Sequence, residues 1–192
     1  MPSARSTVPI AAALLLAGCA HAPPLATVND FDAERYLGTW HEIAAIPAWF
    51  QRRCVRDTTA NYAAAPEPGQ IEVANSCRRA DGTLDTAQGR ARFVAAETEG
   101  RLEVTFFRLG SWWLWPVAGA YDVVAVDPGY RWSLVGHPSR DYAWILAREP
   151  QLDDATLRQL EQRLSAAGYD PCRLIVTAAG SPRVGQSLCA PT

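Results

Sequence analysis

The sequence of 192 residues has one methionine, three histidines and no excess of positive charge. Because His21, His41 and His137 lack the spacing of metal ligands, neither a metal nor another cofactor is expected. The formal net charge of −2 excludes a basic surface over the whole molecule, so we predict no nucleic-acid partner. Internal repeats and low-complexity segments are also absent. With 48% hydrophobic residues, the composition predicts one compact domain with a real core.

No apolar run in the sequence is long enough to span a bilayer as a helix. Residues 8–17 are apolar and follow Arg5, which is typical of a cleaved signal. The run leads into a Leu-Ala-Gly-Cys sequence ending at Cys19, which resembles a bacterial lipobox. We therefore expect cleavage before Cys19 and lipid attachment to its thiol. An ordinary signal peptide with a chance cysteine is the alternative.

The residue after Cys19 bears on the membrane that would hold the protein. It is Ala20, not the Asp that retains lipoproteins at the inner membrane of enteric bacteria. This favours a lipid-anchored protein of the outer membrane that faces the periplasm. The expected organisation is a lipoprotein signal peptide at residues 1–18, a tether at 19–30, and a folded domain with a C-terminal tail at 31–192.

The body of the chain reads as short strands separated by turns. Turn sequences such as Asp81-Gly82 mark the joins, and no helix lies between the strands to carry a parallel crossover. An antiparallel up-and-down barrel or a sandwich follows from this pattern. The eight expected strands are 38–46, 54–63, 70–77, 89–96, 101–108, 120–127, 130–137 and 142–148.

One helix is expected after the last strand. Asp153 or Asp154 can cap it, and Gly168 can end it. Its apolar residues, Leu157, Leu160 and Leu164, recur at helical spacing. A single apolar stripe predicts that this helix packs on the outside of the β-structure.

Two blocks of sequence carry a family resemblance. Residues 29–44, around Gly38-Thr39-Trp40, resemble the opening of the lipocalins and their Gly-x-Trp motif. Residues 140–150 resemble the last lipocalin strand, and the helix follows directly, as in that family. Within the family, the chain is most similar to the bacterial outer-membrane lipocalins and apolipoprotein D. The resemblance covers residues 29–176, and it implies an all-β, eight-stranded antiparallel up-and-down barrel with one C-terminal α-helix packed outside.

The same resemblance implies how the barrel is closed and where it opens. Arg148 is expected to stack on Trp40 at the closed end, and both are interpreted as structural. The loops at 45–53, 78–88, 109–119 and 138–141 are expected to surround the open mouth. The third of these loops contains Trp112, Trp113 and Trp115. Such a cluster is expected to meet a bound acyl chain, a membrane or a partner, or else to fold into the barrel.

The expected ligand is a fatty acid or a lysophospholipid. Alternation along the strands gives an apolar inner wall, although the face of each strand is uncertain by one residue. Arginines around the mouth would form a basic collar that pairs with carboxylate or phosphate. The candidate ligand-binding residues are Tyr62, Phe93, Phe106, Tyr121 and Trp132 on the wall, Trp112, Trp113 and Trp115 in the loop, and Arg52, Arg53, Arg78 and Arg79 in the collar.

Four cysteines remain once Cys19 is set aside. In the hairpin of the second and third strands, Cys54 lies roughly opposite Cys77. A bridge there would leave Cys172 and Cys189 to join and hold the C-terminal tail. The alternative, closer to apolipoprotein D, joins Cys54 to Cys189. Either scheme suits an oxidising periplasm.

No catalytic residue is assigned. His137, Ser139 and Asp141 are the residue types of a hydrolase triad, but on one short loop they cannot adopt its geometry. We therefore predict a non-enzymatic lipocalin, monomer or dimer, that stores or transports its lipid unchanged. One alternative is a structural or interaction lipoprotein that docks on a membrane or a protein through the Trp-rich loop. A less favoured alternative is a lipocalin-type isomerase acting through Cys54.

Overall fold

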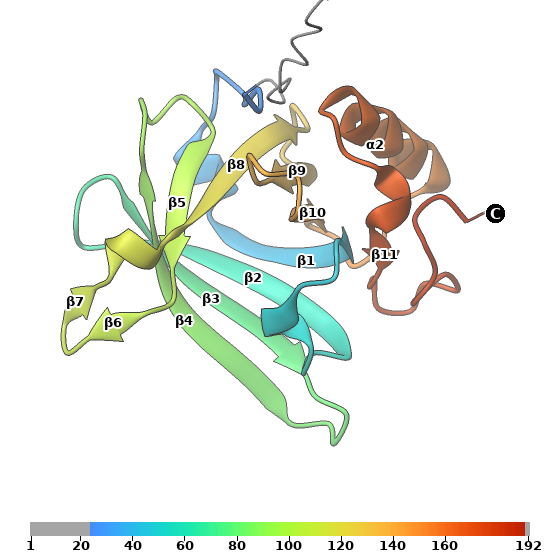
Figure 1. The fold of residues 1–192 in the computed structure, drawn as a ribbon, viewed down its shortest axis with the longest axis horizontal. Coiled ribbons are helices and arrows are strands. Elements are labelled where there is room, and N and C mark those ends of the chain that lie inside the picture. The colour runs from blue at the N-terminus through green and yellow to red at the C-terminus, as the bar shows by residue number, and fades with distance from the viewer. Residues whose placement is uncertain (1–23, 191–192) are drawn as a thin grey trace, which may run out of the picture.

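The computed structural model describes residues 24–190 and confirms an eight-stranded antiparallel barrel (Figure 1). Neighbouring strands follow one another along the chain, and the last strand pairs with the first to close the barrel. Short turns between antiparallel strands are sufficient for this connectivity, as the sequence predicted. The barrel strands are β1 (Gly38–Ala45), β2 (Arg56–Ala64), β3 (Gln70–Arg78), β4 (Leu84–Phe93), β5 (Arg101–Thr105), β8 (Gly119–Val126), β9 (Trp132–Gly136) and β10 (Ala143–Ala147).

Smaller elements surround the barrel. They are α1 (Ala33–Tyr36), η1 (Trp49–Gln51), the hairpin strands β6 (Arg108–Leu109) and β7 (Trp112–Trp113), η2 (Trp115–Val117), α2 (Asp154–Ala166), η3 (Pro171–Arg173) and β11 (Ile175–Val176). The expected helix is confirmed as α2. Asp153 caps it by accepting a hydrogen bond from the Thr156 amide, and Gly168 adopts a φ of +83° beyond its end.

The barrel wall separates two apolar cores. One fills the barrel interior, and the other lies between the outer wall and α2, which Figure 1 shows beside β9, β10 and β11. Leu157, Leu160 and Leu164 of α2 belong to the outer core. The inner core consists of Phe31, Tyr36, Trp40, Ala60, Tyr62, Ile71, Val73, Ala91, Leu102, Val123, Tyr130, Val135 and Leu146.

Trp132 faces the outer core, so the prediction that it lines the barrel interior is wrong. It pairs with Ala147, and both side chains belong to the cluster against α2. The guanidinium of Arg163 on α2 lies 5.6 Å from the Trp132 ring. The neighbouring Ser133 takes the inward position instead. Because successive side chains in a strand point to opposite faces, an error of one residue inverts the assignment.

Several strand boundaries differ from the expected ones, and the two largest differences lie at one end of the barrel. β4 begins at Leu84 rather than at residue 89, and β5 ends at Thr105 rather than at 108. As a result β5 covers only Arg90–Phe93 of β4. Residues 56–58, 75–78 and 84–89 continue past the rest of the barrel (Figure 1), and we call them the β2–β4 extension.

The described part of the expected tether, residues 24–30, packs on the barrel. Leu25 is buried in the outer core. The Val28 amide donates to the Val123 carbonyl at 3.0 Å, and the Phe31 amide donates to the Thr98 carbonyl at 2.8 Å. Apolar side chains at positions 25 and 28 explain this packing. The predicted signal peptide and Cys19 lie outside the described residues.

Candidate functional site: the barrel interior and its mouth

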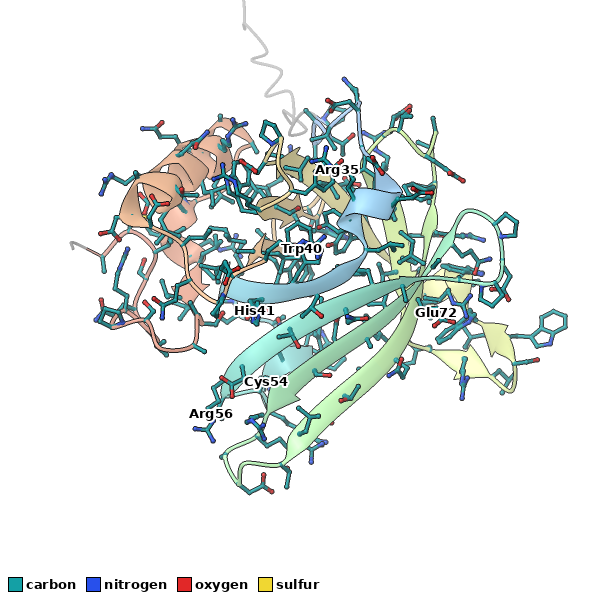
Figure 2. All side chains as sticks on the ribbon, turned by 180° about the vertical axis from the view of Figure 1, so that it is seen from behind. Arg35, Trp40, His41, Cys54, Arg56 and Glu72 are labelled. Carbon is teal, nitrogen blue, oxygen red and sulfur yellow. A yellow bond between two sulfur atoms is a disulfide. The ribbon has the colours of Figure 1, made fainter. Side chains whose placement is uncertain are left out.

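The closed end of the barrel is built around Trp40 and Arg148. The Arg148 guanidinium lies 3.9 Å from the Trp40 ring and donates to the carbonyls of Thr39, Arg35 and Leu37 at 2.7–2.9 Å. The fully buried Trp40 donates through Nε1 to the Tyr36 carbonyl at 2.8 Å. Figure 2 shows Arg35 and Trp40 at this end and Cys54 and Arg56 at the other.

Gly38 explains how Arg148 can approach so closely. Its φ is +94°, and a β-carbon at this position would lie 3.3 Å from Nη1 of Arg148. A larger residue would be strained in the backbone and would crowd the guanidinium. Gly38, the first residue of the Gly-x-Trp motif, therefore leaves room for the contact between Arg148 and Trp40, the third residue of the motif.

A chain of hydroxyl groups crosses the floor of the interior. Tyr62 bonds Tyr121, Tyr121 bonds Tyr36, and Tyr36 bonds Ser133, each at 2.9 Å. Burial raises the pKa of Tyr36 to about 12, and it also raises the pKa values of Tyr62 and Tyr121, so all three phenols stay neutral. Phe93 packs nearby, with its ring 6.0 Å from that of Phe31.

A small enclosed cavity lies against this floor. This cavity of about 10 Å³ is lined by Phe31, Tyr36, Tyr62, Ile71, Ala91, Leu102, Val104 and Tyr121. That volume suits roughly one water molecule and no acyl chain. A lipid in this barrel would therefore lie above the cavity, toward the mouth.

The inner face of β4 is lined by small residues in the mouth half. Alternation from Ala91 places Gly89 and Ala87 on the same inward face. The Phe106 ring lies over Gly89, where a β-carbon would approach it to 2.8 Å. Phe106 is 39% exposed, so part of its ring is open to solvent. The structure thus places this predicted wall residue at the side of the mouth.

An aromatic cluster lines the opposite part of the mouth. The rings of Tyr142 and Trp144 are stacked with their centroids 6.1 Å apart. Phe50 lies 5.9 Å from Tyr142, and Trp49 lies 5.7 Å from Phe50. We call these four residues the mouth aromatic cluster. Trp49 and Phe50 are exposed, whereas Tyr142 and Trp144 are partly buried.

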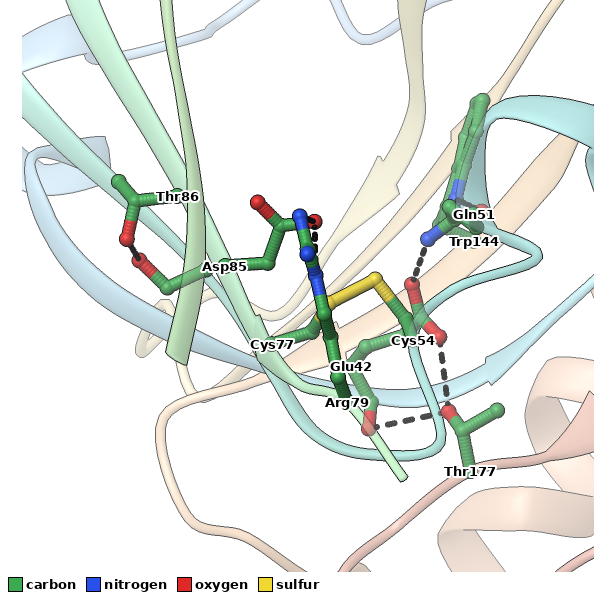
Figure 3. The surroundings of a disulfide bond; sticks show 10 residues. Glu42, Gln51, Cys54, Cys77, Arg79, Asp85, Thr86, Trp144 and Thr177 are labelled. Atoms are coloured by element: carbon green, nitrogen blue, oxygen red, sulfur yellow. Dashed lines mark hydrogen bonds and ion pairs between the residues drawn. A yellow bond between two sulfur atoms is a disulfide. The ribbon is translucent and has the colours of Figure 1, made fainter. Parts of the chain in front are cut away.

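Glu42 lies buried beneath this cluster and is not among the predicted site residues. Its Oε2 accepts a hydrogen bond from Nε2 of Gln51 at 2.8 Å, and its Oε1 accepts one from the Thr177 hydroxyl at 2.9 Å. Oε1 of Gln51 in turn accepts from Nε1 of Trp144 at 3.4 Å (Figure 3). Burial raises the pKa of Glu42. The available signal was its position two residues after Trp40, on the inward face of β1.

The disulfides resolve the alternatives that the sequence left open. Cys54 is bonded to Cys77, with Cα atoms 5.4 Å apart, and Cys172 is bonded to Cys189, with Cα atoms 5.0 Å apart. The first bridge ties the β1–β2 loop to β3 at the mouth (Figure 3). The second ties the C-terminal tail to η3. The pairing of Cys54 with Cys189 is therefore excluded.

The four arginines of the expected collar have different surroundings. Arg79 donates through Nε and Nη2 to Oδ2 of Asp85 at 2.9 and 2.7 Å. Nε of Arg78 lies 3.3 Å from a carboxylate oxygen of Asp57. Arg52 donates to the Trp49 carbonyl, and Arg53 is exposed. Two of the four positive charges are thus partly neutralised by carboxylates.

The Trp-rich loop lies on the outside of the wall rather than in the interior. The Arg90 and Arg108 guanidiniums lie 5.6 and 5.8 Å from the Trp113 ring, and that of Arg92 lies 4.2 Å from the Trp115 ring. Arg90 and Arg92 alternate with the inward residues of β4, so they point outward. Trp113 and Trp115 therefore lie against the outer wall, and the alternative in which their loop folds into the barrel is wrong.

Trp112 is the most exposed tryptophan of this loop. It pairs with Leu109 across the β6–β7 hairpin, and the two side chains are 78% and 75% exposed. Figure 1 shows the hairpin projecting away from the barrel. Trp112 contributes to an exposed apolar tip and not to the barrel interior.

The family follows from a comparison with known proteins. A model of the lipocalin-like domain matches residues 31–179. The chain belongs to the lipocalin family. This lipocalin is 36% identical over 168 residues to the outer membrane lipoprotein Blc of Escherichia coli K12, which covers 85% of this chain and 90% of the relative. It is also 36% identical over 156 residues to apolipoprotein D of Macaca fascicularis, covering 78% of this chain and 77% of the relative.

A solved structure supports the lipocalin fold independently. Insecticyanin from the tobacco hornworm Manduca sexta superposes with a TM-score of 0.65 at 23% identity, covering 86% of this chain and 89% of that one. The sequence relatives are lipocalins and outer membrane lipoproteins, not enzymes, in agreement with the predicted non-enzymatic character.

Two features are absent from the part of the lipocalin that the structure describes. Residues 24–190 contain no group of three or more His, Cys, Asp or Glu side chains that could hold a metal ion. None of the helices within the same residues is long and apolar enough to cross a membrane.

Proposed function

We propose that this lipocalin is a lipid-anchored protein of the outer membrane that holds a fatty acid or a lysophospholipid in the mouth half of its barrel. It stores or transports the lipid without chemical change. Attachment through Cys19 and the periplasm-facing location rest on the lipobox-like sequence and on the similarity to outer membrane lipoproteins.

The observation that carries the proposal is the shape of the mouth half. Ala87, Gly89 and Ala91 are successive inward residues of β4, and none has a side chain larger than a methyl group. Phe106 provides an aromatic surface beside them. Because burying a CH₂ group contributes roughly 0.8 kcal/mol, an acyl chain along this wall can overcome the cost of ordering it. Arg79 at the rim can interact with an acidic head group.

Blocking the inner wall tests the proposal. Ala87→Trp places a large ring on the inner face of the mouth, while Gln88→Trp places the same ring on the outer face of the same strand. Both residues are exposed, so neither change overpacks the core. We expect Ala87→Trp to weaken binding of a fluorescent single-chain lipid at least about tenfold, and Gln88→Trp to leave it unchanged. Equal affinities for the two variants would contradict binding in the mouth.

The second candidate function is docking on a membrane or a protein through the β6–β7 hairpin. The exposed Leu109 and Trp112 favour it. Large apolar side chains that lie together on a surface commonly mark a site of contact with a membrane or a protein. Organic extraction of the purified lipocalin followed by mass spectrometry separates the two functions. A co-purified single-chain lipid supports storage or transport. An empty extract together with failed lipid titration supports docking.

A further inference from the structure

A buried carboxyl group at the mouth has no cation beside it. Glu42 is 7% exposed, and within residues 24–190 it forms no ion pair. Its two hydrogen-bond donors, Gln51 and Thr177, are neutral. An ionised carboxylate away from water is costly unless a positive charge accompanies it. The site therefore favours any cation that can reach it.

The rings next to Glu42 also suit a cation. Trp144 is linked to Glu42 through the Gln51 side chain, and Tyr142 stacks on Trp144. Phe50 continues the cluster toward solvent. Aromatic faces attract ammonium groups through their negative quadrupole, and they do so more strongly where water is excluded. A cation entering the mouth would pass along these rings before reaching the carboxyl group.

An anion-binding group stands in the same neighbourhood. Arg79 and Glu42 both surround the Cys54–Cys77 disulfide (Figure 3). Asp85 occupies Nε and Nη2 of Arg79 through a single oxygen. The third nitrogen, Nη1, makes no hydrogen bond to any residue between 24 and 190, so it remains available to an incoming phosphate oxygen.

We propose that the mouth binds the zwitterionic head group of a single-chain phospholipid. Its primary ammonium replaces the Gln51 amide on Oε2 of Glu42, beside Trp144 and Tyr142, and its phosphate interacts with Arg79. This inference rests on the proposed function, because the acyl chain in the barrel supplies most of the affinity. It narrows the ligand class, since a fatty acid has no cation to offer Glu42.

The test uses the unmodified protein with three lipids that share one acyl chain. They are a lysophospholipid with an ethanolamine head group, the same lipid N-acetylated so that it keeps its phosphate and loses the ammonium, and the free fatty acid. Competition against a fluorescent lipid gives their affinities. We expect the ethanolamine lipid to bind about tenfold more tightly than its N-acetyl derivative. Equal affinities would overturn the inference without any mutation.

The variant Glu42→Gln assigns the effect to its residue. It should weaken binding of the ethanolamine lipid about tenfold and leave that of the N-acetyl lipid unchanged. Glu149→Gln removes the same charge from an exposed position and should leave both affinities as they are. Equal losses for both lipids in Glu42→Gln would assign Glu42 a purely structural role and would overturn the inference.

The outcomes also separate this inference from the proposed function. If the unmodified lipocalin binds all three lipids equally, the proposed storage or transport of lipid is supported and the proposed recognition of the head group is contradicted. If it binds none of them, the proposed function fails and the inference fails with it. If the Glu42→Gln variant does not fold, the affinities of the unmodified protein for the ethanolamine and N-acetyl lipids decide whether the ammonium is recognised.

Discussion

At the scale of single residues, Arg148 shows how one side chain can close a barrel. Its guanidinium lies over the Trp40 ring and satisfies three carbonyl groups that follow or end α1. The planar fork is essential to this arrangement, because an ammonium is a point charge that cannot stack and spread its donors in one plane. The contact joins the beginning of the barrel to its last strand.

Arg148→Lys should therefore cost nearly as much as Arg148→Ala. We expect each variant to lower the free energy of unfolding by about 2–4 kcal/mol, because several carbonyls lose a charged donor. Urea denaturation measures the change, and Arg158→Ala on the exposed face of α2 is the control. Full stability of the lysine variant would show that positive charge alone is sufficient at this position.

The sequence predicted some residues of the site and missed others for identifiable reasons. Trp40 and Arg148 were assigned from the lipocalin resemblance, and the structure brings them into contact. Alternation from Trp40 places Glu42 on the same face of β1, but the register of β1 with β10 shifts between Glu42 and Ala44. No local sequence pattern predicts such a register shift. The break in alternation after Glu42, and the Gln51 and Thr177 donors that face its carboxyl group, could therefore not be predicted.

At the scale of elements, the β6–β7 hairpin combines one well-packed tryptophan with one exposed tryptophan. Trp113 lies between Arg90 and Arg108 on the outer wall. Trp112 extends from the other face of the hairpin, beside Leu109. Adjacent residues of a strand point in opposite directions, which explains their different surroundings.

The two tryptophans should respond differently to truncation. Trp113→Ala is expected to cost about 1–2 kcal/mol of stability, because it removes two cation–π contacts and the packing beneath them. Trp112→Ala is expected to stay within about 0.5 kcal/mol of the unmodified protein. Thermal unfolding of the two variants provides the comparison. A larger loss for Trp112→Ala would mean that the hairpin tip is covered in solution.

The elements themselves were largely predictable. Eight strands and α2 follow from alternation, turn residues and an apolar stripe at helical spacing, and the family resemblance selects a barrel over a sandwich. The end of β5 was not predictable, because residues 106–108 continue the alternation of a strand. Their departure from the wall is decided by tertiary contacts, in which the Thr105 hydroxyl accepts from the Phe107 amide and donates to the Leu114 carbonyl.

At the scale of the whole molecule, two acids give stability opposite dependences on pH. Burial raises the pKa of Glu42 in the folded state, so its contribution is present below the unfolded pKa and is lost as pH rises through the folded one. Hydrogen bonds from Arg131 lower the pKa of Asp127, so its contribution is present above the unfolded pKa and is lost as pH falls through the folded one.

These two effects predict greatest stability in mildly acidic solution, with a decline toward neutral pH to which Glu42 contributes together with Asp122, whose pKa burial also raises. Glu42→Gln should flatten this decline and leave the acid side, where Asp127 titrates, unchanged. Urea denaturation between about pH 3 and pH 8 covers the ordinary range of both carboxyl groups. Glu149→Gln serves as the control for removal of a charge. An unaltered slope in Glu42→Gln would place the source of the decline in another group.

The barrel closes only when its last strand, β10, pairs with β1, so folding cannot be completed before β10 is available. Arg148 donates to the Arg35 carbonyl across a separation of 113 residues, and β1 pairs with β10 over a similar distance along the chain. Contacts between such distant segments make folding slow, because the entropy of closing the loop is lost before the contacts form. A chain emerging N-terminus first therefore exposes both edges of an unfinished sheet until β10 has emerged. During synthesis, the protection of those edges must come from outside the chain.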